Sequence, residues 1–185
     1  MKEYILEFKR VIPTDFCKKI LAYHQDDYEE AKIILNNQTL LDKETRNCSR
    51  KDISSPKTFG EKLVLNYIKA QIFNVINGYK QSYPNININR ISQIELLKYE
   101  KNSFETGFAL HVDHGDQASY RALSVSIALN NDYDGGEFVF SLPEGEVVYE
   151  QNIGDVLVFP SNWMFPHQVN KITNGTRYAI VSWLI

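Results

Sequence analysis

The sequence predicts an α+β protein that is mainly β, arranged as a β-sandwich or jelly roll with N-terminal helices supporting one sheet. Helical patterns are confined to the first half of the chain, and short β-type runs divided by turn residues fill the second half. This order of elements is typical of helices packed on one face of an antiparallel sheet. At 185 residues the chain is expected to form one domain, residues 1–185, with a sizeable core.

The N-terminal half is expected to contain one strand and two helices. Residues 4–8 read as a strand, and residues 15–23 read as a helix that Thr14 would cap. Residues 59–82 carry apolar side chains at helical spacing and should pack them against the back of a sheet, with Asn77 and Gly78 fraying the end. The repeating residues are Leu65, Ile68, Ile72, Val75, Ile76 and Tyr79.

The segment 36–57 is rich in Asn, Thr, Ser, Lys and Asp. One interpretation is a solvated loop, because such residues rarely fill a core. The other is a mobile flap over a functional site, since lids are commonly drawn from polar segments of this kind. The sequence leaves both interpretations open.

After Pro84 the pattern changes to short strands separated by turns. Gly135-Gly136 and Asn174-Gly175 mark two tight turns. The expected strands are residues 93–99, 108–113, 120–129, 137–140, 155–159, 167–170 and 177–184.

The strand at 120–129 has two unlike faces. Large apolar residues occupy one face, which we expect in the core: Leu123, Val125, Ile127 and Leu129. Small residues occupy the other face: Ala122, Ser124, Ser126 and Ala128. A solvent-facing surface would more often bring Lys, Glu or Thr, so the small face is predicted to border space for a ligand.

Three residues match the donors of a mononuclear metal site. His111 and Asp113 form an H-x-D pair, whose side chains would share one face of an extended strand, and His167 follows at a distance. Two imidazoles and one carboxylate are the facial triad of non-haem Fe(II) oxygenases. An H-x-D pair alone often occurs by chance, but the chain has only four His. His24 is expected at the surface, and His114 is expected to be a neighbour of the site.

Arg177 lies ten residues after His167, on a strand face that it shares with Ala179, Val181 and Trp183. A guanidinium buried without an anion is costly, so an anionic partner is expected. A carboxylate suits the planar fork of Arg. The alternative is a salt bridge to an acid inside the protein.

The flanking segments "LLKYEKNSFETGFALHVDHG", "LNNDYDGGEFVF", "GDVLVFPSNWMFPHQV" and "NGTRYAIVSWLI" occur in an order that resembles Fe(II)/2-oxoglutarate oxygenases of the prolyl 4-hydroxylase type. The resemblance covers residues 94–185, and "VIPTDFCKKIL" and "TRNCSRKD" extend it more weakly. It implies a double-stranded β-helix, with Fe(II) on the triad, 2-oxoglutarate as cosubstrate and ascorbate in support. Arg177 would hold the distal carboxylate, and Tyr99 would lie beside the cosubstrate.

Two positions depart from relatives of that type. Ala128 stands where oxygen-sensing animal prolyl hydroxylases have a second cosubstrate-binding tyrosine, so Ser124 or Ser126 would supply a hydroxyl instead. Phe108 stands where algal-type enzymes have a tyrosine. Both departures concern the substrate and leave the iron chemistry unchanged.

The resemblance implies a dioxygenase that converts 2-oxoglutarate and O2 to succinate and CO2 while hydroxylating a C–H bond. A peptidyl prolyl 4-hydroxylase is the first expectation, with a peptide or protein as substrate. The alternatives are a hydroxylase of an amino acid, another small molecule or a nucleobase, and a non-catalytic jelly-roll binding module.

Charge and cysteine content narrow the partners. The net charge of −3 and pI near 5.8 give no general attraction to nucleic acid, although a local basic groove stays open. Cys17 and Cys48 are too few for a disulfide framework. The start lacks the apolar core of a signal peptide and no stretch could span a membrane, so we expect a cytoplasmic protein.

Overall fold

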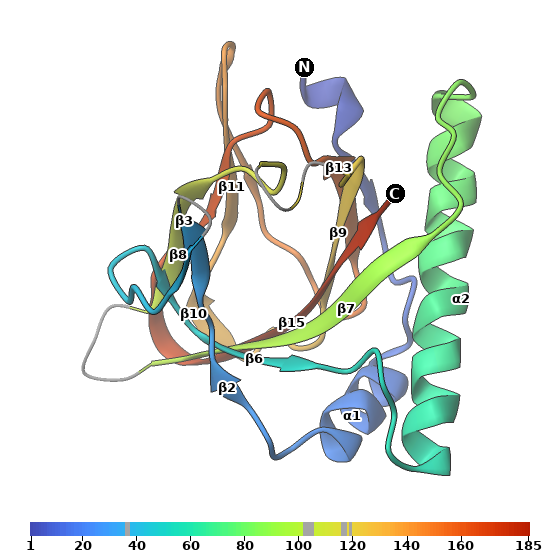
Figure 1. Ribbon diagram of the computed structural model, residues 1–185, viewed down its shortest axis with the longest axis vertical. Coiled ribbons are helices and arrows are strands. Elements are labelled where there is room, and N and C mark those ends of the chain that lie inside the picture. The colour runs from blue at the N-terminus through green and yellow to red at the C-terminus, as the bar shows by residue number, and fades with distance from the viewer. Residues whose placement is uncertain (36–37, 102–105, 116–117, 119) are drawn as a thin grey trace.

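The computed structural model describes residues 1–185 apart from 36–37, 102–105, 116–117 and 119, and it shows two antiparallel sheets facing each other (Figure 1). The larger sheet runs in the order β1 (Leu6–Phe8), β13 (Val156–Pro160), β9 (Leu123–Ala128), β15 (Ile172–Leu184), β7 (Ile91–Glu100), β6 (Ser49–Asp52) and β2 (Glu29–Glu30), and β10 (Tyr133–Gly135) also pairs with β15.

The smaller sheet has the order β12 (Gly145–Tyr149), β11 (Phe138–Leu142), β14 (His167–Val169), β8 (Gly107–His111) and β5 (Arg46–Asn47). A separate hairpin is formed by β3 (Ile33–Leu35) and β4 (Gln38–Leu40). Strands from distant parts of the chain alternate within each sheet, as in the expected double-stranded β-helix.

The helices cover the outer face of the larger sheet (Figure 1). They are α1 (Thr14–Tyr23) and α2 (Phe59–Ser82), and a short 3-10 helix, η1 (Lys2–Tyr4), lies just before β1 in the chain. A capping box starts α2, because the Thr58 hydroxyl accepts from Glu61 N and a Glu61 carboxylate oxygen accepts from Thr58 N. The predicted span of this helix is confirmed, but the expected fraying is wrong. Gly78 continues the helix where a Cβ would come within 2.8 Å of the Phe8 ring.

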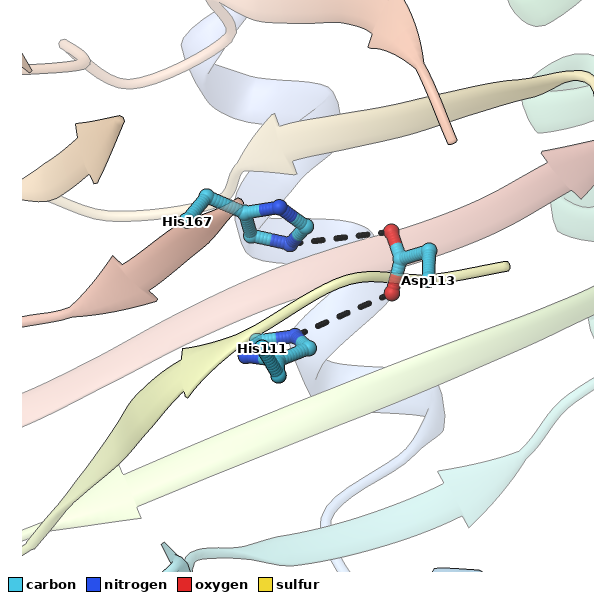
Figure 2. A group of neighbouring side chains, drawn as sticks. All are labelled: His111, Asp113 and His167. Atoms are coloured by element: carbon cyan, nitrogen blue, oxygen red, sulfur yellow. Dashed lines mark ion pairs between the residues drawn. The ribbon is translucent and has the colours of Figure 1, made fainter. Parts of the chain in front are cut away.

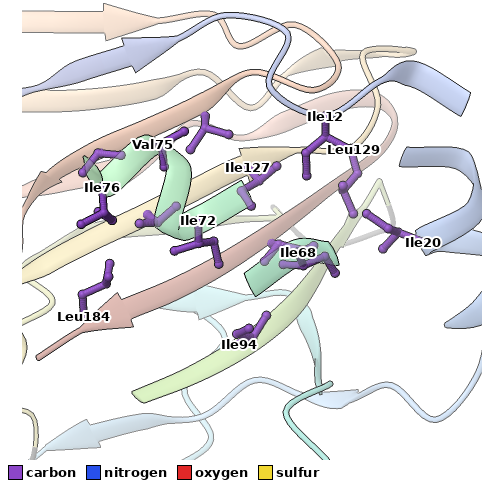
Figure 3. Packing of buried hydrophobic residues seen from close by; sticks show 14 of the residues in the cluster. Ile12, Ile20, Ile68, Ile72, Val75, Ile76, Ile94, Ile127, Leu129 and Leu184 are labelled. Carbon is purple, nitrogen blue, oxygen red and sulfur yellow. The ribbon is translucent and has the colours of Figure 1, made fainter. Parts of the chain in front are cut away.

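The apolar stripe of α2 forms one core with the larger sheet (Figure 3). Ile68, Ile72 and Ile76 are buried against sheet residues such as Ile94 and Ile127. Each such side chain contributes about 1.5–3 kcal/mol through burial of its apolar surface. The large-residue face predicted for the strand at 120–129 is confirmed, since its members belong to this core: Leu123, Val125, Ile127 and Leu129.

A second apolar cluster fills part of the space between the two sheets. It is rich in aromatic rings and includes Tyr99, Phe138, Phe140, Phe159 and Phe165. The inner faces of both sheets therefore form an apolar core, and the polar residues of the candidate site lie on the same inner faces. No helix of the described residues combines the length and apolarity needed to cross a membrane.

Two predictions for the first helix are wrong. Thr14 is the first helical residue rather than the cap, Pro13 takes the N-cap position, and no side-chain cap is formed. His24 is 4% exposed rather than at the surface. It lies just after α1 and lines a small cavity with Ile53 and Glu61, so its burial results from packing between α1, β6 and α2.

The polar segment 36–57 is not only a loop. Ser49–Asp52 pairs with β7 along the larger sheet, and Arg46–Asn47 pairs with β8 in the smaller one. The chain thus passes from β5, the edge strand of the smaller sheet, to β6, which lies between β7 and the short edge strand β2 of the larger sheet. Residues 36–37 of the predicted flap lie outside the described residues. Polar side chains are tolerated in these two short strands because their residues are only partly buried or exposed.

Candidate metal centre

His111, Asp113 and His167 meet inside the roll (Figure 2). His111 ends β8 and His167 begins β14, and the two are directly paired across these strands. His111 Nε2 lies 3.7 Å from Asp113 Oδ1, and His167 Nε2 lies 3.7 Å from Asp113 Oδ2. One potential ligand atom from each residue lies within 4.8 Å of the others. The sequence prediction that these three side chains lie together agrees with this geometry.

Asp113 reaches the cluster by a different route from the one predicted. The strand was expected to include residue 113, but β8 ends at His111 and Asp113 follows in a bend. Its side chain is held by Ser124, whose Oγ donates to Asp113 Oδ2 at 2.6 Å. Its backbone carbonyl accepts from Arg121 Nη1 at 3.2 Å. Hydrogen bonds from Ser124 and Arg121, rather than strand pairing, therefore orient Asp113.

Both imidazoles direct the same nitrogen toward Asp113. His111 Nδ1 lies 2.8 Å from the carbonyl of Ala109, and His167 Nδ1 lies 3.0 Å from that of Phe165. In a neutral ring, a carbonyl neighbour requires the proton on Nδ1, so each Nε2 keeps a free lone pair. Hydrogen bonds of this kind fix the tautomer of histidines that bind metals.

Ionisation in the cluster suits a divalent cation. Burial lowers the pKa of His111 to about 3, and nearby His167 adds to this effect, so the ring is neutral at pH 7. Burial opposes the charge on Asp113, but His167, His111 and the Ser124 hydroxyl together hold its pKa below the ordinary value. Two imidazoles and a carboxylate, with donor atoms that converge, fit a mononuclear Fe(II) site.

Aromatic rings fix the two imidazoles in place. The Phe108 ring stacks on His111 with centroids 3.5 Å apart and planes 13° apart, and Arg46 Cζ lies 4.8 Å from the Phe108 centroid. Phe138 stacks on His167 with centroids 5.0 Å apart. Phe108, noted in the sequence only as a departure from a tyrosine, therefore supports a metal-site histidine.

Arg177 is a buried cation on the larger sheet. It lies on β15 beside Tyr99 of β7, is 2% exposed, and its Cζ is 5.4 Å from the Tyr99 ring centroid. Its Nε has no hydrogen-bond partner, and no carboxylate among the described residues pairs with it. Glu95, a buried acid on the same inner face, is paired instead with Arg50 and Arg46. The geometry thus favours an external anion over the internal salt bridge.

Tyr99, Ser124 and Ser126 were predicted to contact the cosubstrate. Tyr99 is buried next to Arg177, and burial raises the pKa of its hydroxyl, so it stays protonated. Ser124 Oγ is bonded to Asp113, and Ser126 Oγ donates to Gln151 Oε1 at 3.3 Å. Both serine hydroxyls already have protein partners, and the cosubstrate role of these residues stays a prediction.

Two further residues escaped the sequence analysis. Arg121 places its guanidinium 3.6 Å from the Trp183 ring centroid while it bonds Asp113, and Ser161 Oγ lies 2.8 Å from Ser124 Oγ. Neither belongs to a recognisable short motif, and both reach the site only through tertiary packing. His114 has the neighbour role that was predicted, with its Nδ1 3.4 Å from the Arg121 carbonyl.

A family model described as the 2OG-Fe(II) oxygenase superfamily matches residues 94–185, a range that includes the three donors and Arg177. This chain belongs to the 2OG-Fe(II) oxygenase superfamily. The family model matches the same residues of this oxygenase, 94–185, that carry the resemblance in the sequence. Membership implies Fe(II) as the metal and 2-oxoglutarate as the cosubstrate.

Curated relatives of this oxygenase carry the name PKHD-type hydroxylase. One from Prochlorococcus marinus strain MIT 9301 is 32% identical over 95 residues, covering 50% of this chain and 42% of the relative. One from Psychrobacter sp. strain PRwf-1 is 39% identical over 87 residues, covering 42% of this chain and 33% of the relative. The matches therefore span less than half the length of these relatives.

Solved structures share the fold across nearly the whole of this oxygenase. A Trichoplax adhaerens prolyl hydroxylase, solved with a peptide fragment of the hypoxia inducible factor oxygen degradation domain, superposes with a TM-score of 0.81 at 17% identity, covering 98% of this chain and 83% of its own. A Pseudomonas putida prolyl-4-hydroxylase gives 0.75 at 18% identity, covering 98% and 91%. At these identities the likeness confirms the double-stranded β-helix.

Proposed function

We propose that this oxygenase is an Fe(II)- and 2-oxoglutarate-dependent dioxygenase that hydroxylates a peptidyl residue, proline first. The overall reaction takes 2-oxoglutarate, O2 and a C–H bond to succinate, CO2 and a C–OH group. One oxygen atom enters succinate and the other enters the hydroxyl. The observation that carries this proposal is the convergence of His111, Asp113 and His167 inside the roll, together with the buried Arg177 on the larger sheet, whose Nε has no hydrogen-bond partner.

Separate residues would bind the metal and the cosubstrate. His111 Nε2, His167 Nε2 and an Asp113 oxygen would hold the cation, and Arg177 would hold the distal carboxylate of 2-oxoglutarate. Bound Fe(II) with its cosubstrate supplies the oxidising chemistry that amino-acid side chains lack. The protein positions the reactants and excludes water, which the aromatic packing around His167 favours.

The preference for a polypeptide substrate rests on the segments that flank the triad. Trp163 is 75% exposed and Met164 is partly exposed on the connection that leads into His167. Tyr120 is exposed on the connection that follows Asp113. Large apolar side chains exposed beside a site are typical of surfaces that bind a chain. The peptide-bound state of the Trichoplax structure supports the same substrate class.

The first test is turnover with purified protein, Fe(II), ascorbate and proline-containing peptides. We expect succinate formation above the peptide-free level and a peptide mass gain of one oxygen atom. His111→Ala should abolish both signals because the metal loses a ligand. His114→Ala is the matched control, since His114 lies outside the donor cluster, and it should retain them.

The same assay separates the substrate classes. Trp163→Ala should weaken peptide stimulation of succinate formation by roughly tenfold, in line with the loss of an exposed aromatic contact residue. Stimulation by a free amino acid with no response to any peptide would contradict the peptidyl assignment and move this oxygenase to small-molecule hydroxylation. Failure to bind any divalent metal would contradict the dioxygenase assignment itself.

A further inference from the structure

Of the three proposed metal ligands, Asp113 is the one that strand pairing does not position. His111 and His167 lie within paired strands, whereas Asp113 lies two residues past the end of β8. A carboxylate on a bend must be oriented by side chains or by backbone contacts from elsewhere. The structure supplies such contacts from β9 and from the residue that follows β13, two strands that pair with each other in the larger sheet.

Two buried serines form a hydrogen-bonded chain that ends on the carboxylate. Ser124 Oγ lies 2.6 Å from Asp113 Oδ2, and Ser161 Oγ lies 2.8 Å from Ser124 Oγ. Ser124 is 2% exposed and Ser161 is 1% exposed, so water does not compete for either hydroxyl. Ser161 is itself fixed by its backbone, since its N donates to the Ala122 carbonyl and its carbonyl accepts from His114 N.

Proton counting gives the chain one direction. A hydroxyl carries a single proton, and an ionised carboxylate can only accept. The Ser124 hydroxyl must therefore donate its hydrogen bond to Asp113, so in the contact between the serines Ser161 must donate to Ser124. Hydrogen bonds aligned in this way polarise one another, which strengthens the bond to the carboxylate.

We infer that Ser161 is a positioning residue for the metal site, acting through Ser124 on the Asp113 carboxylate. Holding Oδ2 leaves Oδ1, the oxygen that faces His111, to bind the cation through a single oxygen. Groups that orient a metal ligand in this way typically account for 10–100-fold in metal affinity. This inference rests on the proposed function only in taking Asp113 as a metal ligand.

The test measures Mn(II) and Co(II) binding to the metal-free protein, without turnover. Ser124→Ala should raise the Mn(II) dissociation constant by about tenfold or more. Ser161→Ala should raise it several-fold and shift the visible absorption of the Co(II) protein, because the carboxylate gains freedom. Ser161→Thr keeps a hydroxyl and should restore affinity toward that of the parent. Ser182→Ala is the matched control, since it removes a buried hydroxyl that bonds the Gln93 carbonyl and does not touch the triad.

A double-mutant cycle separates positioning from general destabilisation. If Ser161 acts through Ser124, adding Ser161→Ala to Ser124→Ala should change the Mn(II) dissociation constant little further. Equal effects of Ser161→Ala in both backgrounds would overturn the inference, as would a folded Ser161→Ala protein with the parent's affinity and Co(II) spectrum. If Ser161→Ala does not fold, Ser161→Cys takes its place: its thiol is only a weak hydrogen-bond donor, so parental Mn(II) affinity and an unchanged Co(II) spectrum in that variant would overturn the inference. Absence of metal binding in the parent would instead count against the proposed function.

Discussion

Replacing Arg177 with Met tests whether this buried cation awaits the carboxylate of 2-oxoglutarate. Met keeps a long side chain in the same space and removes the charge. In the ligand-free protein the Arg177 Nε has no partner and no described carboxylate pairs with the guanidinium, so its removal leaves no protein group unpaired. We therefore expect Arg177→Met to fold with a ligand-free stability equal to or above that of the parent.

The effect should appear when 2-oxoglutarate is added. Truncating one partner of a buried, hydrogen-bonded charge pair costs about 2–5 kcal/mol, which corresponds to a rise of roughly 30-fold to several thousand-fold in the dissociation constant. At 100 times the parent's dissociation constant, the ligand stabilises the parent by about 2.7 kcal/mol. That is a rise in melting temperature of about 5–11 °C for a chain of this length. The variant should gain less than about 1 kcal/mol at the same concentration.

The assay is thermal unfolding of the Mn(II)-loaded protein without oxygen, with 2-oxoglutarate titrated in. Arg90→Met is the control, since Arg90 is exposed and should leave the ligand-dependent shift unchanged. Mn(II) affinity, measured separately, should be the same in parent and Arg177→Met. A variant that keeps the full 2-oxoglutarate shift would refute the reasoning, because the buried guanidinium would then have no role in binding the anion.

Three further predictions concern stability. Burial lowers the pKa of His24 below the ordinary 6.5, so below that pH the unfolded chain binds more protons and the free energy of unfolding should fall. In His24→Met, denaturant titrations across pH 5–8 should show a shallower dependence of the free energy of unfolding on pH. An unchanged pH dependence would show that another group is responsible. Ile68→Ala in the α2 core should cost about 2–5 kcal/mol in urea unfolding, whereas exposed Leu63→Ala should cost little; equal losses would contradict the assigned helix face. Thr58→Ala removes the hydroxyl that accepts from Glu61 N in the capping box and should lower the free energy of unfolding by about 1 kcal/mol. A stability equal to the parent's would show that this cap does not stabilise the helix.

The sequence predicted the long helix and most strands of the second half because their signals are local. The apolar period of residues 59–82 is set by helix geometry, and the alternation in strands such as β9 and β15 is set by the pleat. The donors were also readable, since His111, Asp113 and His167 are chemically distinctive and few in number. Arg177 stood out because a charge shares a strand face with apolar residues.

The elements that escaped prediction depend on partners far along the chain. The mostly polar residues 46–52 form β5 and β6, which pair with β8 and β7 through backbone hydrogen bonds, while their side chains carry no periodic signal. His24 is buried by packing between α1, β6 and α2, although its own segment resembles a surface helix. Local composition cannot report either contact.

The sequence by itself determined which donors are present, and the tertiary structure alone decided how Asp113 is aimed. Asp113 lies beyond the end of its strand, and hydrogen bonds from Ser124 and Arg121 orient it. Ser124 is in turn hydrogen-bonded to Ser161, which lies 37 residues further along the chain. Serine is common and its hydroxyl makes many local bonds, so no pattern marks these two as a pair. Only the pairing of β9 with β13 brings their hydroxyls together beside the carboxylate.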